Sequence, residues 1–365
     1  MKKIFAEYIW LDGYSTQNIR CKTKVITPPT DVNTYDDPWN FPAWTFDGSS
    51  TKQAGEGFDF NGTDCVLRPV SVWKDPFRGD LHRLVFCEVF LPDGKNPHPS
   101  NTRFHLRKTI EQMEEIEKTR NDIFDPWFGW EQEYTMTSRV IPFSDKRALP
   151  LGFSTPESAR PQGEYYCAVG GDNVVGRNIA EKHLELSVKC GLEISGINSE
   201  VLLGQWEFQV GPVNALDGAD QLWISRYILH RVSEEYGVRI SLDPKPLEGD
   251  WNGSGCHVNF STSAMRKSDG MKFIEEACEL LRDRHQAHIT EYGEDNQRRL
   301  TGKHETSSMD AFSWGMSERS TSVRIPAQAI VDGRGYFEDR RPASNCDPYR
   351  VANMMISTVI VEKNV

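Results

Sequence analysis

The sequence predicts an α+β fold in two parts, a small, mainly β domain followed by a larger domain in which strands alternate with long helices. Three observations support this prediction. The chain has 365 residues, which is too long for one simple core. Short strand-like runs fill residues 1–97, whereas helical periodicity appears only in residues 98–365. Between them, LPDGKNPHPSN (91–101) holds three prolines and is typical of a linker.

The first domain is expected to contain no long helix and four strands, at residues 4–11, 23–26, 66–72 and 84–90. The chain opens MKKIFAEYIWLDG, which has two lysines as a signal peptide would. Glu7 and Asp12 interrupt its apolar run, so this opening is predicted to be a strand.

The second domain is expected to contain five helices. Ser100 or Asn101 should cap the first, which ends at Thr119, and the others should span 177–190, 219–236, 271–289 and 348–361. Asp217 and Gly218 give a turn signal just before the third helix. An apolar stripe on that helix is predicted to be core: Leu222, Ile224, Tyr227, Ile228 and Val232.

Charge and composition exclude several classes of protein. The net charge of −11 argues against a nucleic-acid or anionic-membrane partner. No apolar run is long enough to predict a membrane span. The eight cysteines form no CxxC pair and are typical of reduced, mostly buried thiols, so a cytoplasmic location is expected.

Four strand-like segments place acidic side chains where they could hold divalent cations. The segments are WFGWEQEYT (127–135), SEVLLGQWEFQV (199–210), WNGSGCHVNFS (251–261) and YFEDRRP (336–342). Side chains two apart in a strand share a face, so Glu131 and Glu133 project together. The candidate ligands are five carboxylates and one imidazole, a set that suits Mg²⁺ or Mn²⁺: Glu131, Glu133, Glu200, Glu207, His257 and Glu338.

The alternative is that EQE is an ordinary solvated strand face. The apolar and aromatic neighbours of each acid favour a ligated site, because Glu is seldom buried unless it is paired or bound to a metal.

Arginines lie close to these acids in the sequence: Arg298, Arg299, Arg319, Arg324, Arg334, Arg340 and Arg341. Guanidinium groups match phosphate and carboxylate oxygens, so an acidic metal site flanked by arginines indicates phosphoryl transfer. Ordinary surface ion pairs are the alternative, above all for Arg298, Arg334 and Arg341. The chain has no P-loop and no GxGxxG, so ATP would be held by another kind of fold.

The chain resembles the type II, eukaryotic-like class of glutamine synthetases over nearly its whole length. The matching segments are YIWLDG, WTFDGSS, WFGWEQEYT, PQGEYYCAVG, EVLLGQWEFQVG, LDPKP, DWNGSGCHVNFST, RRLTGKHETSS, RSTSVRIP and GYFEDRRPASNCDPY. The resemblance implies an N-terminal β-grasp domain and a catalytic domain with a curved antiparallel sheet backed by helices. It also implies a homo-oligomer, a decamer of two stacked pentameric rings.

The activity implied by this resemblance is ATP-dependent ligation of ammonium to the γ-carboxylate of L-glutamate. The products are L-glutamine, ADP and phosphate, and γ-glutamyl phosphate is the intermediate. The implied cofactors are Mg²⁺ or Mn²⁺, two or more per site, with ATP as co-substrate.

The resemblance also implies residue roles. Glu133, Glu200 and Glu207 resemble ligands of the metal that activates the γ-carboxylate and ammonia, and Glu131, His257 and Glu338 those of the metal on the ATP phosphates. Implied substrate contacts are Asp250, Trp251, Asn252, Gly253, His257, Arg299, Arg319 and Arg340. Implied nucleotide contacts are Glu131, Glu207, Asn259, Phe260, Ser261, Arg319, Arg324 and Tyr336.

Asp47, Glu305 and Arg319 are the implied catalytic residues. Asp47 resembles the group that takes a proton from ammonium at the neighbouring subunit's site, and its alternative is an Asp-Gly turn residue. Glu305 resembles a mobile flap acid that excludes water, and its alternative is a solvated loop acid.

The chain departs from the family pattern in two places. The N-terminal helical extension of animal and plant members is missing, and Asp250 stands where many relatives have Asn. Three other functions stay open: an inactive structural relative, a ligase for another small amine such as methylamine, and a guanidino-substrate phosphotransferase.

Overall fold

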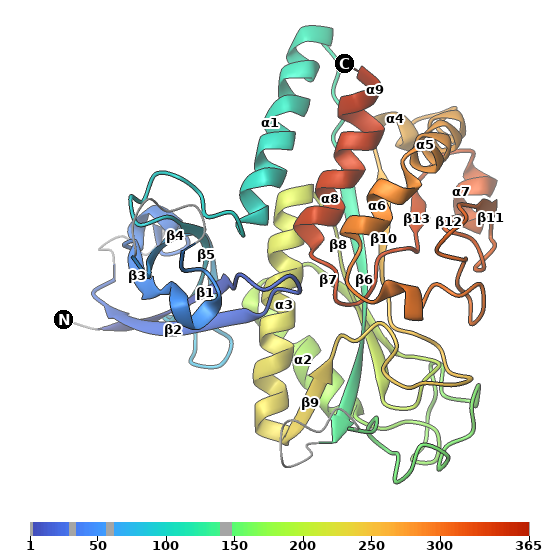
Figure 1. The fold of residues 1–365 in the computed structure, drawn as a ribbon, viewed down its shortest axis with the longest axis horizontal. Coiled ribbons are helices and arrows are strands. Elements are labelled where there is room, and N and C mark those ends of the chain that lie inside the picture. The colour runs from blue at the N-terminus through green and yellow to red at the C-terminus, as the bar shows by residue number, and fades with distance from the viewer. Residues whose placement is uncertain (1–2, 29–33, 56–61, 139–147, 365) are drawn as a thin grey trace.

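The computed structural model describes residues 3–28, 34–55, 62–138 and 148–364. Strands form one sheet in the N-terminal part and a second, curled sheet in the C-terminal part, and helices pack against the second sheet (Figure 1). The predicted fold class, a small strand domain followed by an α+β domain, is therefore confirmed.

The N-terminal sheet has five strands in the order β2-β1-β5-β4-β3. Its strands are β1 (Ile4–Leu11), β2 (Ile19–Ile26), β3 (Trp44–Asp47), β4 (Asp64–Lys74) and β5 (Arg83–Phe90). β1 pairs with β5 in parallel, and the other neighbours are antiparallel. Among the described residues of this domain, the helical segments are the short 3₁₀ turns Pro38–Asn40 and Gly48–Thr51. β3 was not predicted, because WTFD is short and is followed at once by a turn.

The second sheet has eight strands, in the order β11-β12-β13-β10-β6-β8-β7 with β9 paired to β6. Its strands are β6 (Trp127–Ser138), β7 (Ile194–Ser199), β8 (Gln205–Val213), β9 (Val238–Ser241), β10 (Cys256–Ser261), β11 (Trp314–Met316), β12 (Val323–Ile325) and β13 (Phe337–Asp339). Most neighbours are antiparallel as expected, but β11 and β12 run parallel.

The longer helices are α1 (Thr102–Arg120), α2 (Arg177–Cys190), α3 (Ala215–Tyr236), α5 (Met271–Asp283), α6 (His285–Glu291) and α8 (Pro348–Ile356). The prediction of one helix over 271–289 was wrong, because the chain breaks at Arg284 between α5 and α6. The segment 348–361 is helical throughout, but its last turn, Ser357–Val361, is a π-helix. The short helices are α4 (Ser263–Arg266), α7 (Ala327–Asp332) and α9 (Glu362–Asn364).

The start of α3 was also predicted wrongly. Asn214 caps this helix by accepting a hydrogen bond from the backbone N–H of Asp217, so Asp217 and Gly218 lie inside its first turn. The Asp217 side chain is favourable in the first turn, because a negative charge stabilises the N-terminus of a helix. The predicted apolar stripe of α3 is buried, as expected.

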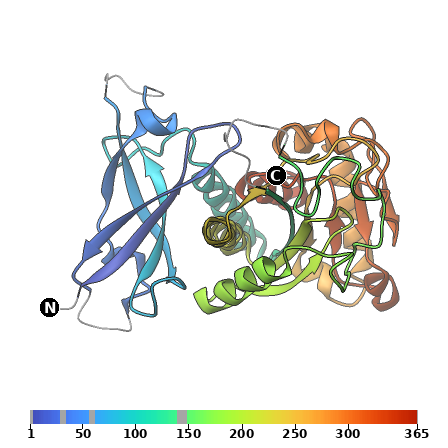
Figure 2. The ribbon, with the colours of Figure 1, turned by 90° about the horizontal axis from the view of Figure 1, so that it is seen from below.

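Helix α3 runs between the two sheets, and the curled sheet faces away from the N-terminal strands (Figures 1 and 2). Arg103 of α1 joins the parts: it donates to Asp220 of α3 at 2.8 Å and 2.9 Å, and to Glu88 of β5 at 2.9 Å. All three side chains are buried, so these ion pairs are shielded from water. The described helices include none with the length and apolar character needed to cross a bilayer.

Candidate metal and nucleotide site

Four neighbouring strands bring five of the six predicted metal ligands together. Cross-strand register places His257 of β10 opposite Glu131 of β6, and Glu133 of β6 opposite Glu207 of β8. Glu338 of β13 lies opposite Asn259 on the other side of β10. Directly opposite residues have adjacent side chains on one face of a sheet, so the four strands gather these acids on a common face.

The ligand atoms fall into two groups that share His257. Glu131, His257 and Glu338 form one triad, with His257 Nδ1 at 3.5 Å from Glu131 Oε2 and 3.4 Å from Glu338 Oε1. Glu133, Glu207 and His257 form the other, and within each triad the ligand atoms lie within 4.8 Å of one another. Glu200 belongs to neither triad, because it follows the end of β7 and its backbone N–H donates to the Gln205 carbonyl in a turn.

Three of the acids have raised pKa values when no cation is present. Burial, opposed by Arg299, raises the pKa of Glu133 to about 7. Burial and the charge of Glu133 raise the pKa of Glu200 to about 8. Burial and the charges of Glu131, Glu200 and Glu133 raise the pKa of Glu207 to about 9. A divalent cation would relieve this repulsion, so the donor set fits Mg²⁺ or Mn²⁺.

Glu338 is fully buried and bonded to two arginines. It accepts hydrogen bonds from Arg324 Nε and, at 2.7 Å, from Arg340 Nη1. Arg340 also donates to the backbone carbonyls of Arg319 and Glu305, each at 3.2 Å. Arg340 thereby links a candidate ligand to the segment that carries the predicted flap acid.

Three further arginines differ in whether they contact a candidate ligand or an acid outside the cluster. Arg299 is buried, and its Nη2 lies 3.1 Å from His257 Nε2. Arg298 forms ion pairs with Asp243 at 2.9 Å and Glu248 at 2.7 Å. Arg341 pairs with Asp339 at 2.7 Å. For Arg298 the structure therefore shows the ordinary surface ion pairs that were the alternative interpretation, whereas the Arg341–Asp339 pair is fully buried.

A cavity of about 440 Å³ lies beside the first triad. Five of the predicted nucleotide contacts line it: Glu131, Asn259, Phe260, Ser261 and Tyr336. The other three, Glu207, Arg319 and Arg324, are not among its lining residues. Asn259 Nδ2 donates to Glu131 Oε1 at 2.7 Å, so the wall of the cavity is bonded directly to a candidate ligand.

Arg266 and Trp127 also line this cavity and were not predicted as site residues. The Arg266 guanidinium stacks 3.9 Å from the centroid of the Trp127 ring, and its Nη1 donates to Ser261 Oγ at 2.9 Å. Trp127 and Tyr336 are exposed aromatic rings at the same cavity. Only the aromatic character of WFGW could have indicated this role for Trp127.

The predicted substrate segment 250–253 is held from several sides. Trp251 is buried and packs against Phe153 and Tyr165. A Cβ on Gly253 would lie 2.6 Å from both Arg299 Cγ and the Pro244 carbonyl oxygen, so a larger residue there would require movement of both the Arg299 side chain and the backbone. Gln162 donates to Asn252 Oδ1 at 2.9 Å. Asp250 is exposed, with Oδ1 3.6 Å from His304 Nε2.

Asp47 lies in the other domain, at the end of β3. It caps the turn 48–51 by accepting from Ser49 N at 3.0 Å and Ser49 Oγ at 2.6 Å, and these bonds lower the pKa of its carboxyl. Among the described residues, no hydrogen bond or ion pair joins Asp47 to the acidic cluster. In Figure 1, β3 lies on the opposite side of α1 and α3 from the curled sheet.

Glu305 is exposed beside the cluster, and its charge contributes to the raised pKa of Glu200. Both His304 and Glu305 have left-handed backbone conformations, with φ of 53° and 59°. Such values are uncommon for residues other than glycine.

Three amides beside the acids were missed. Gln205 donates to the Gly253 carbonyl at 2.9 Å and to Glu133 at 3.4 Å, and Asn198 and Gln209 bond Glu200 and Glu207. The signal was present in QWEFQ, because Gln205 and Gln209 stand two residues either side of Glu207 and so share its face.

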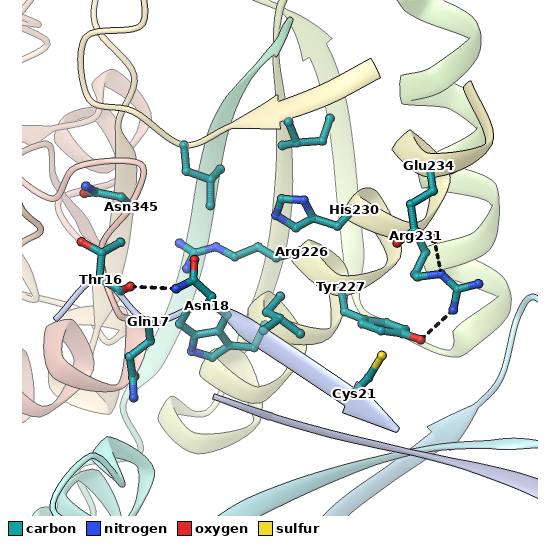
Figure 3. Close-up of a pocket in the computed structure, with 14 residues that line it drawn as sticks. Thr16, Gln17, Asn18, Cys21, Arg226, Tyr227, His230, Arg231, Glu234 and Asn345 are labelled. Carbon is teal, nitrogen blue, oxygen red and sulfur yellow. Dashed lines mark hydrogen bonds and ion pairs between the residues drawn. The ribbon is translucent and has the colours of Figure 1, made fainter. Parts of the chain in front are cut away.

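A second cavity of about 440 Å³ lies at the junction of the two sheets. Arg226, Tyr227 and His230 of α3 line it together with residues 16–19 (Figure 3). None of the predicted site residues lines this second cavity.

The fold and the site together define a class: two-domain α+β proteins whose curled sheet carries an acidic cluster beside a nucleotide-sized cavity. Residues 100–277 match the family described as glutamine synthetase, catalytic domain. The chain is 47% identical to the chloroplastic glutamine synthetase of Chlamydomonas reinhardtii, over 97% of this chain and 90% of that protein. It is 46% identical to the glutamine synthetase of Agaricus bisporus, over 99% of this chain and 94% of that protein.

It is also 44% identical to the glutamine synthetase cytosolic isozyme 1-1 of Oryza sativa subsp. japonica, over 99% of this chain and 95% of that protein. The chain belongs to the glutamine synthetase family.

Proposed function

We propose that this protein ligates ammonium to the γ-carboxylate of L-glutamate at the expense of ATP. Family membership supports the reaction. Within the site, the main support for this reaction is the pair of triads that share His257, because two adjacent divalent cations are suited to phosphoryl transfer.

The proposed reaction has two steps. An oxygen of the glutamate γ-carboxylate forms a bond to the γ-phosphorus of ATP, and the bond from that phosphorus to its bridging oxygen breaks, releasing ADP. The nitrogen of ammonia then bonds to the acyl carbon of γ-glutamyl phosphate, and the carbon–oxygen bond breaks to release phosphate.

Mg²⁺ or Mn²⁺ would be held by Glu131, His257 and Glu338 and by Glu133, Glu200 and Glu207. When bound, such ions screen phosphate charge and polarise the reacting oxygens. The cavity beside the first triad is of a size and lining suited to the nucleotide, with Trp127 and Tyr336 available to stack on its base. Arg319 and Arg324 are the proposed phosphate contacts, and Arg299 and Arg340 are the proposed contacts of the glutamate carboxylate.

Glu305 is proposed to close the site. Its left-handed backbone and exposed side chain suit a loop that rearranges when substrates bind. Closure excludes water, which would otherwise hydrolyse the acyl phosphate.

Asp47 is proposed to take the proton from ammonium at the site of a neighbouring subunit. Its position away from the acids of its own chain supports this role, because a second copy would be needed to complete the site. The proposed assembly is a homo-oligomer, a decamer of two pentameric rings. The boundary near residue 97 and the cytoplasmic location also stay predictions; the relatives carry both chloroplastic and cytosolic names.

The decisive experiment is a panel of amines with phosphate release and amide product measured in parallel. With Mg²⁺, ATP and L-glutamate, ammonium should give equal amounts of phosphate and glutamine, and methylamine should give little of either. A stronger response to methylamine would indicate a ligase for another amine. Absence of any turnover with Mg²⁺ or Mn²⁺ would indicate an inactive structural relative.

A further inference from the structure

A chain of amide hydrogen bonds connects Glu200 with Glu207. Gln209 Nε2 donates to Glu207 Oε1 and, at 2.9 Å, to Asn198 Oδ1. Asn198 Nδ2 then donates to Glu200 Oε1 at 2.8 Å. The second oxygen of Glu200 accepts the backbone N–H of Val201 at 3.2 Å.

Strand register creates this chain. β7 and β8 are antiparallel, with Asn198 opposite Glu207 and Gly196 opposite Gln209. A Cβ on Gly196 would lie 2.6 Å from Gln209 Oε1, so the absence of a side chain at this position leaves room for the Gln209 amide.

The direction of the bonds fixes both amide groups. Each amide turns its NH₂ toward a carboxylate, and the Asn198 oxygen accepts from Gln209. Rotating either amide by half a turn would remove the hydrogen bond that its NH₂ donates, and once the acids are ionised it would set an oxygen against a carboxylate. Both carboxylates are therefore held in defined orientations while they are still free of metal.

This chain of hydrogen bonds explains how Glu200 is held near the cluster, which strand pairing alone does not explain. Glu200 lies in a turn beyond β7 and outside both triads, whereas Glu207 belongs to the triad with Glu133 and His257. The two amides tie this turn residue to β8, so that a third carboxylate stays beside the second triad.

We propose that Asn198 and Gln209 are positioning residues that hold Glu200 and Glu207 for a divalent cation bound with Glu133. This inference rests on the proposed function, since it assumes that the acids bind metal. Outer-shell partners orient ligands, and their loss commonly weakens metal binding by about 10–100-fold.

The test measures Mn²⁺ binding to the substrate-free protein by calorimetry and by electron paramagnetic resonance of free Mn²⁺. Asn198→Ala and Gln209→Met should each weaken one class of Mn²⁺ site about 10-fold or more and leave the class formed by Glu131, His257 and Glu338 unchanged. A merely structural defect would weaken both classes together. Gln328→Met is the matched control, because Gln328 donates to Asp332 at 2.9 Å on an exposed helix away from the cluster.

Gly196→Ala provides an independent route to the same result, since its Cβ would displace the Gln209 amide without removing any hydrogen-bonding group. It should weaken the same class of site as Gln209→Met. The positioning role alone would be overturned if the affinities of both classes of Mn²⁺ site stayed unchanged in all three variants. It would also be overturned if both affinities weakened equally. A wild-type protein that binds no Mn²⁺ would overturn the proposed function as well.

Discussion

Arg340 Nη1 lies 2.7 Å from Glu338 Oε1, and the two side chains are only 7% and 0% exposed. Together with Arg324, Arg340 neutralises a carboxylate that belongs to the candidate site for the nucleotide-side cation. A cation bound there must therefore share Glu338 with two guanidinium groups. Arg340 also donates to the Glu305 carbonyl. A change in the Glu338–Arg340 ion pair when a cation binds would therefore also affect the predicted flap segment.

Replacement of Glu338 should separate its role in metal binding from its role in stability. Glu338→Gln keeps an acceptor for only one of the two arginines and removes the charge, so turnover should fall by about 100-fold or more and binding of Mg²⁺·ATP should weaken. Glu338→Ala should in addition lose about 3–5 kcal/mol of unfolding free energy, because two poorly hydrated guanidinium groups lose their carboxylate. Steady-state kinetics and denaturant unfolding measure the two effects. Wild-type activity of either variant at limiting Mg²⁺ would show that Glu338 is not a ligand.

In the metal-free protein, three buried acids should contribute less to stability as pH rises. The pKa values of Glu133, Glu200 and Glu207 are raised from 4.5 to about 7, 8 and 9. Between these limits these three groups bind more protons in the folded protein than in the unfolded chain, so their contribution to the free energy of unfolding falls with increasing pH. A divalent cation competes with the same protons, so its stabilising effect should grow over the same range.

Unfolding midpoints in EDTA and in Mg²⁺, at about pH 7.5 and about pH 9, measure both trends above the pH range in which histidines titrate. Glu207→Gln should flatten the slope in EDTA. A slope in EDTA that is identical in wild type and Glu207→Gln would contradict the prediction.

Mixing two inactive variants should restore activity. Asp47 and Glu207 lie in different domains of one chain, and the proposal pairs Asp47 with the Glu207 of a neighbouring subunit. Hybrids of Asp47→Ala and Glu207→Ala subunits would then contain some sites with both residues intact. Activity of the mixture after subunit exchange, which native mass spectrometry verifies, tests this. Exchange without recovery would mean that both residues serve the same subunit's site.

Asp47→Asn should discriminate between nucleophiles. Asn can keep the cap on Ser49, so the turn should persist. Hydroxylamine is neutral near pH ~7 and needs no proton removed before attack. The loss of activity with ammonium should therefore exceed the loss with hydroxylamine by about 10²-fold or more. Loss of the negative charge also weakens attraction of NH₄⁺. Parallel assays of glutamine and γ-glutamyl hydroxamate measure the ratio. Equal losses would leave Asp47 as a turn residue only.

Much of the architecture was predictable from local patterns. Strand alternation in EQE correctly put Glu131 and Glu133 on one face, and the apolar stripe of α3 correctly predicted a core helix. Two of the errors concerned where helices begin and end, and the strand β3 was missed altogether. Asn214 starts α3 earlier than the Asp217–Gly218 signal suggested, and Arg284 divides the helix predicted over 271–289.

Residue types and strand periodicity were enough to predict candidate ligands for a hard cation, because ligand chemistry depends on residue type and strand periodicity is local. The sequence by itself could not determine how the ligands are shared or supported. Cross-strand register put His257 in both triads and left Glu200 outside them, and the same register brought Asn198 and Gln209 between the acids. Tertiary packing also paired Arg341 with Asp339 while it turned Arg340 toward Glu338. These outcomes depend on contacts between segments far apart in the chain, whose relative positions no local pattern encodes.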